Sequence, residues 1–309
     1  MEEKWLAIVN PNAGNRKAKK DWDKIKGMLH EAHLQFDFLF TEQKEHAIEI
    51  TFQHIIDGYR NFIVVGGDGT LNEVVNGFFK QKIVPVNELT LAMIPIGTGN
   101  DWCRSLNIPF KYKKAIKLIN KQKTRWQDIG KVEFYNSEIP KQRFFANVAG
   151  MGYDAVVAAK TNRDKERGRS GAILYLKNLF TSLLFYDHSN TVMTIDSDST
   201  HKHKTFSMSV GIGKYNGGGM KQLPNAEIDD GLFDVTLIKK LGKLTVLKEV
   251  KNLYDGSFIN HPKVDTFRGK KISIESDPQI KLEVDGESLG HSPFHFEIFP
   301  RALRVVAKK

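Results

Sequence analysis

Hydrophobic and polar positions follow two different rhythms along the chain. Up to about residue 130, short apolar runs such as WLAIVN and FIVV alternate with segments in which apolar residues recur at helical spacing, for example Trp22, Ile25 and Leu29. This alternation, with turn residues at the carboxyl end of each strand, predicts an open, mostly parallel sheet with helices on both faces. Ligands of such sheets bind beyond the carboxyl ends of the strands.

The second rhythm begins near residue 131. Strand patterns such as KVEFY, RFFANVAG, TFSMSVGIG and LFDVTLIKK follow one another with few helices between them. This pattern predicts a second, mainly antiparallel β domain. We therefore expect an α/β domain at residues 1–130 and a β domain at residues 131–299, and the strand pattern LRVVA within residues 300–309 is a candidate for completing the first domain.

Glycine-rich loops follow three strands of the first domain. VVGGDGTLNEVVNG at 64–77 places glycines at a strand-to-helix turn, where the backbone can approach an anion closely and helix amides can hold a phosphate. NPNAGNRKA at 10–18 and IPIGTGNDWC at 94–103 are further loops of this kind, although each alone also suits an ordinary turn or helix cap. Three such loops from one parallel sheet should converge at one edge.

Composition narrows the function classes. The 309 residues carry a net charge of +10, which favours an anionic partner such as a nucleotide, a lipid surface or a nucleic acid. Nucleic acid is disfavoured, since no helix-turn-helix, zinc-finger spacing or RNP-like strand accompanies the lysines. The start MEEKWLAIVN does not resemble a signal peptide, Cys103 is a single cysteine, and the apolar stretch 171–186 is shorter than a membrane span, so we expect a cytoplasmic protein without a transmembrane segment.

GGDGTLNEVVNG, with NPNAG before it and PIGTGND after it, resembles the diacylglycerol kinase catalytic family, the lipid kinases that include the sphingosine and ceramide kinases. The likeness continues in WQDIGKV at 126–132, NVAGMGYDA at 147–155, LPNAEIDDGLFDV at 223–235 and LEVDGES at 282–288. GGDGT alone is shared with NAD kinases and phosphofructokinases, whereas the later motifs are similar to the lipid kinases. The short chain resembles the bacterial members.

The resemblance implies a nucleotide-binding α/β domain, a C-terminal antiparallel β-sandwich and the use of ATP. The positions it assigns to ATP are Asn10, Asn12, Thr41, Gly66, Gly67, Asp68, Gly69, Thr70, Asn72, Gly97 and Thr98. Thr41 has an equally good alternative as the cap of the helix that follows it.

The resemblance also implies two magnesium sites. Asp68, Asp101 and Asp128 match the acids that organise the catalytic Mg²⁺ through water, although each also suits a turn or a cap. A structural Mg²⁺ would take the Asp230 carboxylate and the backbone carbonyls of Glu227 and Leu232. The alternative for that second stretch is a plain Asp-Gly hairpin turn.

The motif LEVDGES raises the same choice. Alternation along this strand places Glu283 and Asp285 on one face, and Asp-Gly is a strong hairpin signal by itself. In the family, the aspartate is the base that accepts the proton of the lipid hydroxyl, and Glu287 belongs to the same site. A carboxylate suits that role because it can orient a hydroxyl and accept its proton.

The sequence thus predicts an ATP-dependent lipid kinase in phospholipid metabolism, with diacylglycerol as the favoured acceptor and phosphatidic acid as the product. The alternatives are an NAD kinase and a catalytically silent lipid-binding protein of the same fold. Sphingoid bases, ceramide, undecaprenol and monoacylglycerol also remain candidate acceptors. We expect peripheral docking on an anionic membrane, with Arg163, Lys165, Arg167 and Arg169 of the segment 160–169 as contributors, and a homodimer is a further possibility.

Overall fold

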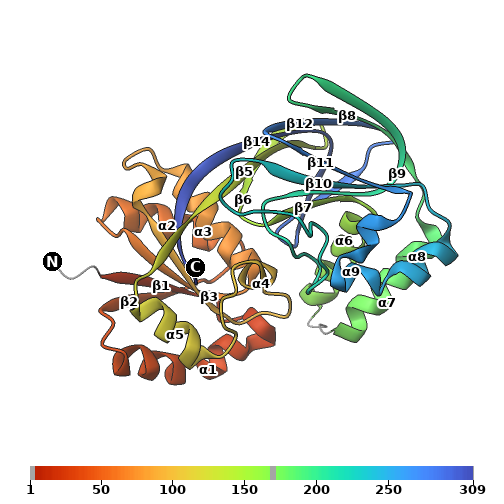
Figure 1. Cartoon of the computed structure of the whole chain (residues 1–309). Coiled ribbons are helices and arrows are strands. Elements are labelled where there is room, and N and C mark those ends of the chain that lie inside the picture. The colour runs from red at the N-terminus through yellow and green to blue at the C-terminus, as the bar shows by residue number, and fades with distance from the viewer. Residues whose placement is uncertain (1–3, 168–171, 309) are drawn as a thin grey trace. The chain divides into compact units, whose positions relative to one another are not determined.

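The structure is a computed structural model that describes residues 4–167 and 172–308. It divides into two compact units (Figure 1). Unit 1 contains Met1–Gln127 and Arg301–Lys309, and unit 2 contains Asp128–Pro300. Each unit is described by itself below.

Unit 1 is built on a parallel sheet. Its strands are β1 (Trp5–Val9), β2 (Phe36–Phe40), β3 (Asn61–Gly66), β4 (Thr90–Pro95) and the end of β14 (Glu287–Val306). They lie in the order β2-β1-β3-β4-β14, with parallel pairing throughout. The last strand joins through Arg304 and Val305, which pair with Thr90 and Leu91 of β4.

Helices cover both faces of this sheet. The helices of unit 1 are α1 (Ala13–Glu31), α2 (His46–Ile56), α3 (Asp68–Lys80), α4 (Asp101–Ser105) and α5 (Tyr112–Asn120), with a 3-10 turn at Val86–Glu88. In Figure 1, α2 and α3 lie on one side of the strands, and α1 and α5 lie on the other. Every residue of β1 and β3 is buried, as expected for strands with both faces covered. On α1 the buried residues include Trp22, Ile25 and Leu29.

Unit 2 is an antiparallel, sandwich-like β domain. Its strands are β5 (Thr124–Asn136), β6 (Ile139–Phe145), β7 (Val148–Gly152), β8 (Ser189–Ile195), β9 (Ser199–Gly211), β10 (Phe233–Lys239), β11 (Val264–Gly269), β12 (Lys271–Asp277), β13 (Lys281–Val284) and the first part of β14. Neighbouring strands pair antiparallel. Phenylalanines fill the interior, and the Phe145 and Phe233 rings stack at 5.8 Å between centroids.

Unit 2 also carries more helix than the strand patterns predicted. Its helices are α6 (Tyr153–Glu166), α7 (Ala172–Phe185), α8 (Lys243–Glu249) and α9 (Asn252–Asp255), followed by a 3-10 turn at Ser257–Asn260. Leu179 and Leu183 of α7 and Val246 of α8 pack with Tyr153 and Phe206 in one apolar cluster. Within the described ranges, no helix has the length and apolar character required to cross a bilayer.

Candidate functional site

The three glycine-rich loops of unit 1 lie together at the carboxyl ends of the strands. The Asn10 side chain, in the loop after β1, donates a hydrogen bond from Nδ2 to Thr70 Oγ1, 2.9 Å away in the first turn of α3, which follows β3. The backbone N–H of Ile96, after β4, donates to the Gly66 carbonyl at 2.7 Å. Parallel strands end at the same edge of a sheet, so the three glycine-rich loops that follow them meet there.

Glycine is required where two of these loops touch. A Cβ on Gly97 would lie 2.6 Å from Asn100 Oδ1 and 3.1 Å from the Cα of Gly67. A Cβ on Gly66 would lie 2.8 Å from Thr70 Oγ1. The backbones therefore approach more closely than side chains allow, which leaves amide groups uncovered for an anion.

Helix α3 begins inside this cluster. Its N-cap is Gly67 in an extended conformation, and no side chain caps the helix. The first-turn amides of such a helix favour an anion such as a phosphate. Of the residues assigned to ATP, Gly69 lies in that first turn, whereas Asn72 is wholly buried and accepts a hydrogen bond from Asn76. Asn72 thus supports the helix from within.

Of the remaining positions assigned to ATP, Asn12 and Thr98 lie in the glycine-rich loops, whereas Thr41 follows β2. The Asn12 N–H donates to Asn10 Oδ1 at 3.0 Å, and Thr98 is exposed. Thr41 is buried at the end of β2, where its N–H donates to the Val9 carbonyl at 2.9 Å. Its alternative as a helix cap is not observed. The N–H groups of Glu45 and Ala47 at the start of α2 donate instead to the Glu73 carboxylate, a contact that the sequence did not reveal.

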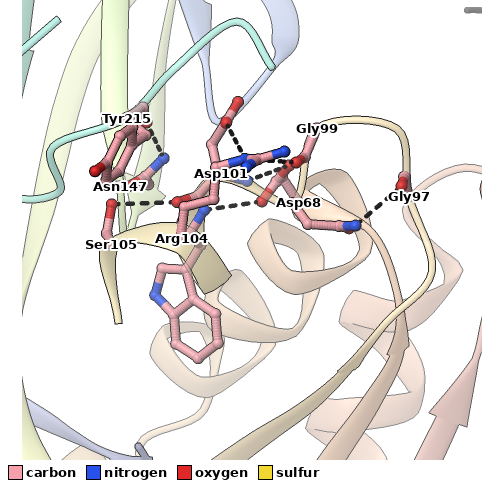
Figure 2. A network of polar contacts seen from close by, with 10 residues as sticks. Asp68, Gly97, Gly99, Asp101, Arg104, Ser105, Asn147 and Tyr215 are labelled. Atoms are coloured by element: carbon pink, nitrogen blue, oxygen red, sulfur yellow. Dashed lines mark hydrogen bonds and ion pairs between the residues drawn. The ribbon is translucent and has the colours of Figure 1, made fainter. Parts of the chain in front are cut away.

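Asp68 and Asp101 lie close together within unit 1. The Asp68 carboxylate accepts the N–H groups of Asp101 and Trp102, each at 3.2 Å, at the start of α4 (Figure 2). Arg104 approaches the Asp101 carboxylate, with Nε 3.5 Å from Oδ1. A Cβ on Gly99 would lie 3.2 Å from an oxygen of each aspartate, so both carboxylates flank the small space that this glycine leaves. Two carboxylates around one space suit a hydrated Mg²⁺.

Asp128, the third acid assigned to the catalytic magnesium, belongs to unit 2. Its side chain is fully buried, and Oδ2 accepts the N–H of Gly231 at 2.6 Å. Its own N–H donates to the Ile228 carbonyl at 2.7 Å, so Asp128 fastens the loop before β10. In the part of the chain that the structure describes, no three His, Cys, Asp or Glu side chains cluster as a metal site. The magnesium role of Asp128 therefore stays a prediction.

The loop assigned to a structural magnesium is occupied by protein groups. Asp230 Oδ1 accepts the Leu232 N–H at 3.0 Å, and the other oxygen forms an ion pair with Arg268. Arg268 also pairs with Asp234, which lies opposite it across β10 and β11. Burial raises the pKa of Asp234 to about 6 although Arg268 opposes this shift. The guanidinium supplies the positive charge beside Asp230 in this structure, and a magnesium site formed by Asp230 with the carbonyls of Glu227 and Leu232 stays a prediction.

Asp285 occupies a tight hairpin turn in unit 2. Val284 pairs with Glu287, and both loop residues have positive φ, 49° at Asp285 and 84° at Gly286, as in a type I′ turn. The turn is therefore observed, and the Asp285 side chain is 3% exposed; its role as a base stays a prediction. Glu287 begins β14 and is half-buried.

Backbone amides surround the Asp285 carboxylate. Oδ1 accepts the N–H groups of Asn147 and Val148, and Oδ2 accepts that of Ala146, each at 3.1 Å. The Asn147 side chain is held in turn by the Tyr215 carbonyl, to which Nδ2 donates at 2.8 Å (Figure 2). Hydrogen bonds from N–H groups favour an ionised carboxylate. The three N–H donors therefore hold the Asp285 carboxylate in one orientation.

Two further buried acids lie beside this turn. Glu283 accepts hydrogen bonds from Asn216 Nδ2 at 2.5 Å and from the Gly286 N–H at 2.9 Å. Burial raises the pKa of Glu283 to about 8, and burial raises that of Asp154 to about 6. Sequence reasoning missed this pair. Gly150 faces Glu283 across the strands, and its Cβ would lie 2.5 Å from the Glu283 carboxylate, a relation that follows only from the pairing of β7 with β13.

Asp154 also lines a cavity in unit 2. The cavity lies between α6, α7, α8 and the β-sheet, has about 40 Å³ of space, and its walls are mainly apolar. Gln222 Nε2 donates to Asp154 Oδ2 at 3.1 Å at its polar end. The apolar lining residues are Tyr153, Val157, Leu179, Phe206, Met220, Ile238, Val246, Val250, Leu253 and Phe258.

Comparisons with known proteins define the class. Residues 4–132 match the model of the diacylglycerol kinase catalytic domain, and residues 147–307 match the YegS C-terminal NAD kinase beta sandwich-like domain. The diacylglycerol kinase of Staphylococcus epidermidis is 30% identical over 100% of this chain and 93% of its own length. That of Staphylococcus carnosus is 28% identical, with 100% and 96% covered.

Solved structures agree with this class. The crystal structure of a diacylglycerol kinase from Bacillus anthracis has a TM-score of 0.74 at 26% identity, covering 99% of this chain and 97% of that one. An NAD kinase from Archaeoglobus fulgidus in complex with ATP shares the fold alone, with a TM-score of 0.52 at 12% identity, covering 99% and 94%. The chain is thus a kinase of the lipid kinase class. It belongs to the diacylglycerol kinase family, as the motif resemblance indicated.

Proposed function

We propose that this chain transfers the γ-phosphate of ATP to the hydroxyl of a membrane lipid, with diacylglycerol as the favoured acceptor and phosphatidic acid as the product. The observation that carries the acceptor class is the cavity of unit 2. Its mainly apolar walls, with a few polar groups among them, suit an acyl chain. A dinucleotide such as NAD would need polar and charged partners instead.

Unit 1 supports the nucleotide half of the proposal. The glycine-rich loops and the uncapped start of α3 supply backbone N–H groups for phosphate oxygens. Asp68 and Asp101 would hold Mg²⁺ beside Gly99, where the ion would neutralise charge on the phosphate oxygens. Asp68 is already fixed by the amides at the start of α4, which reduces the reorganisation needed for binding.

Unit 2 supports the acceptor half. Asp285 accepts the proton of the lipid hydroxyl while that oxygen forms a bond to the γ-phosphorus. The bond between the γ-phosphorus and the bridging oxygen breaks, and ADP leaves with the electron pair. Three backbone amides hold the Asp285 carboxylate in one orientation before the substrate arrives. Glu287, two residues further on, is the second acid of this proposed acceptor site.

An acceptor screen tests the proposal. Purified protein receives γ-labelled ATP and Mg²⁺ with diacylglycerol, monoacylglycerol, ceramide, a sphingoid base, undecaprenol or NAD, and the products are separated by chromatography. We expect labelled lipid, with diacylglycerol the best acceptor. Labelled NADP without labelled lipid would refute the proposal, and binding of lipid without any transfer would identify a silent lipid-binding protein.

A further inference from the structure

Large apolar side chains are exposed on two neighbouring helices of unit 2. The side chain of Phe185 at the end of α7 is 88% exposed, Leu244 at the start of α8 is 75% exposed, and Leu184 is 60% exposed. On the same two helices, the side chains of Phe180 (α7) and Leu247 (α8) are 41% and 45% exposed. Such clustering is uncommon on water-facing surfaces and marks a site that contacts another apolar phase. We call these five residues the α7–α8 surface.

The two helices are physically joined at this surface. Lys243 Nζ at the start of α8 donates a hydrogen bond to the Leu184 carbonyl at the end of α7, at 2.5 Å. Leu183 of α7 and Val246 of α8 share one buried cluster below. The exposed apolar residues therefore lie on a fixed pair of helices rather than on separate tails, as the neighbouring α7 and α8 in Figure 1 also show.

Helical spacing separates an inner and an outer apolar face. Leu179 and Leu183 of α7 point inward, whereas Phe180 and Leu184, one position further along, point outward. On α8, Val246 is buried, whereas Leu244 and Leu247 are exposed. The inner faces also line the cavity, through Leu179 and Val246. The cavity wall and the α7–α8 surface are thus two sides of the same helices.

Basic residues surround the α7–α8 surface. Lys177 lies one turn from Phe180 on α7, and Lys248 and Lys251 continue the stripe that starts at Leu244. The exposed lysines on and beside the two helices are Lys177, Lys240, Lys243, Lys248 and Lys251, and the acids interspersed among them are Asp187 and Glu249. Five positive and two negative charges leave a local excess of three positive charges.

We propose that the α7–α8 surface docks the protein on an anionic lipid bilayer, with Leu184, Phe185 and Leu244 inserted among the lipids and the lysines facing the headgroups. Apolar insertion combined with headgroup attraction is how interfacial helices bind membranes. The charge excess favours an anionic bilayer over a neutral apolar partner. The proposal extends the proposed function, because a membrane-embedded acceptor could then reach the cavity directly behind these helices.

The surface differs from the basic segment 160–169 that the sequence singled out. Arg163 and Arg167 are exposed at the end of α6 and carry no large exposed apolar neighbour on the described part of that helix. Asp164 accepts a hydrogen bond from Asn178, which ties α6 to α7. Arg169 lies outside the described residues, as does the side chain of Lys165. The segment 160–169 can add attraction at long range, but the α7–α8 surface supplies the apolar contact.

Vesicle co-sedimentation tests the proposal without any dependence on kinase activity. The full chain is mixed with vesicles of neutral phosphatidylcholine or of phosphatidylcholine with phosphatidylglycerol, at low and high salt. We expect binding to the anionic vesicles that weakens at high salt, and at least a tenfold loss in the variant Leu184→Ser, Phe185→Ser, Leu244→Ser. The matched control is Ile83→Ser with Ile139→Ser, two side chains that are 56% and 58% exposed elsewhere. The control should bind like wild type.

Melting temperature and size-exclusion chromatography accompany both variants. The proposal is overturned if the triple variant binds vesicles as wild type does, if the control loses binding equally, or if the triple variant alters a dimer instead of vesicle binding. A different outcome concerns only the proposed function: vesicle binding that depends on the surface, without phosphorylation of any lipid, would refute the kinase activity and leave the docking surface standing.

Discussion

The glycine loops of unit 1 and the buried acids of unit 2 differ in which polar groups they offer: backbone N–H groups in unit 1 and carboxyl groups in unit 2. In unit 1, the backbone of the loops has no side chain over it at glycines such as Gly67 and Gly97, so its N–H groups can face an anion. In unit 2, carboxylates such as Asp285 and Glu283 are removed from water and held by N–H donors. Adding an atom should therefore damage unit 1, whereas replacing Asp285 by an uncharged side chain of the same shape should damage unit 2.

The largest expected effect follows from removing the charge of Asp285. Asp285→Asn keeps the shape of the side chain but removes the base, so we expect turnover to fall by on the order of 10² or more. ATP affinity, measured by calorimetric titration, should stay near the wild-type value, because the change lies in the acceptor half. Undiminished turnover would remove Asp285 from the mechanism.

A methyl group at Gly97 is the corresponding test in unit 1. Gly97→Ala places a Cβ against Asn100 Oδ1 and the Gly67 backbone, and overpacking of this kind costs roughly 1–3 kcal/mol. Because the methyl group displaces the loop backbone that is expected to face phosphate, we expect ATP affinity to fall by about tenfold, which is about 1.4 kcal/mol of binding free energy. Gly27→Ala is the matched control, because a Cβ there meets nothing within 4 Å. Equal ATP binding by both variants would contradict the account of the loops.

A substitution at Gly99 should have a smaller effect, limited to the Mg²⁺ requirement. Gly99→Ala puts a methyl group 3.2 Å from one oxygen of Asp68 and one of Asp101. Both carboxylates must shift slightly, so we expect a several-fold higher Mg²⁺ concentration for half-maximal activity, with little change in melting temperature. This concentration is measured by titrating the activity with Mg²⁺ at saturating ATP. An unchanged Mg²⁺ requirement would place the ion elsewhere.

The raised pKa of Glu283 predicts a pH-dependent change in stability. Below its ordinary value of 4.5 the group is protonated in both folded and unfolded states, whereas between about 4.5 and about 8 only the folded state keeps the proton. The free energy of unfolding therefore falls as pH rises through this range, by on the order of a few kcal/mol. Glu283→Gln should abolish that part of the loss.

Urea unfolding at pH 5 and pH 8 measures this contribution. We expect the stability of Glu283→Gln relative to wild type to improve at pH 8 compared with pH 5, whatever the constant cost of the amide. The exposed Glu275→Gln serves as the control and should show no such change. A difference between Glu283→Gln and wild type that is the same at both pH values would mean that Glu283 is ionised in the folded protein.

The local sequence pattern predicted those parts of the structure that are determined by residues close together in the chain. The parallel α/β unit, the antiparallel unit and the meeting of the three loops follow from strand order and from glycines at strand ends. The Asp285–Gly286 hairpin follows from turn chemistry. The family motifs pointed to the lipid kinases for the same reason, since the motifs lie in these loops.

Long-range contacts were beyond sequence reasoning. Glu283 is held by Asn216, which is 67 residues away and lies in irregular chain, so no spacing rule connects them. Arg268 faces Asp234 and Asp230 only because β10 and β11 pair in one register. The α7–α8 surface likewise depends on how α8 folds back beside α7, 59 residues apart at the Lys243 to Leu184 hydrogen bond.

The central claim is that unit 1 presents ATP and unit 2 selects a lipid hydroxyl as the acceptor. The most direct measurement gives the wild-type protein γ-labelled ATP and Mg²⁺ with anionic vesicles that contain diacylglycerol, with NAD present at equal concentration. We expect the label to appear in phosphatidic acid, and we expect Asp285→Asn to lose this product while still binding ATP. Label in NADP, or equal phosphatidic acid from both proteins, would contradict it.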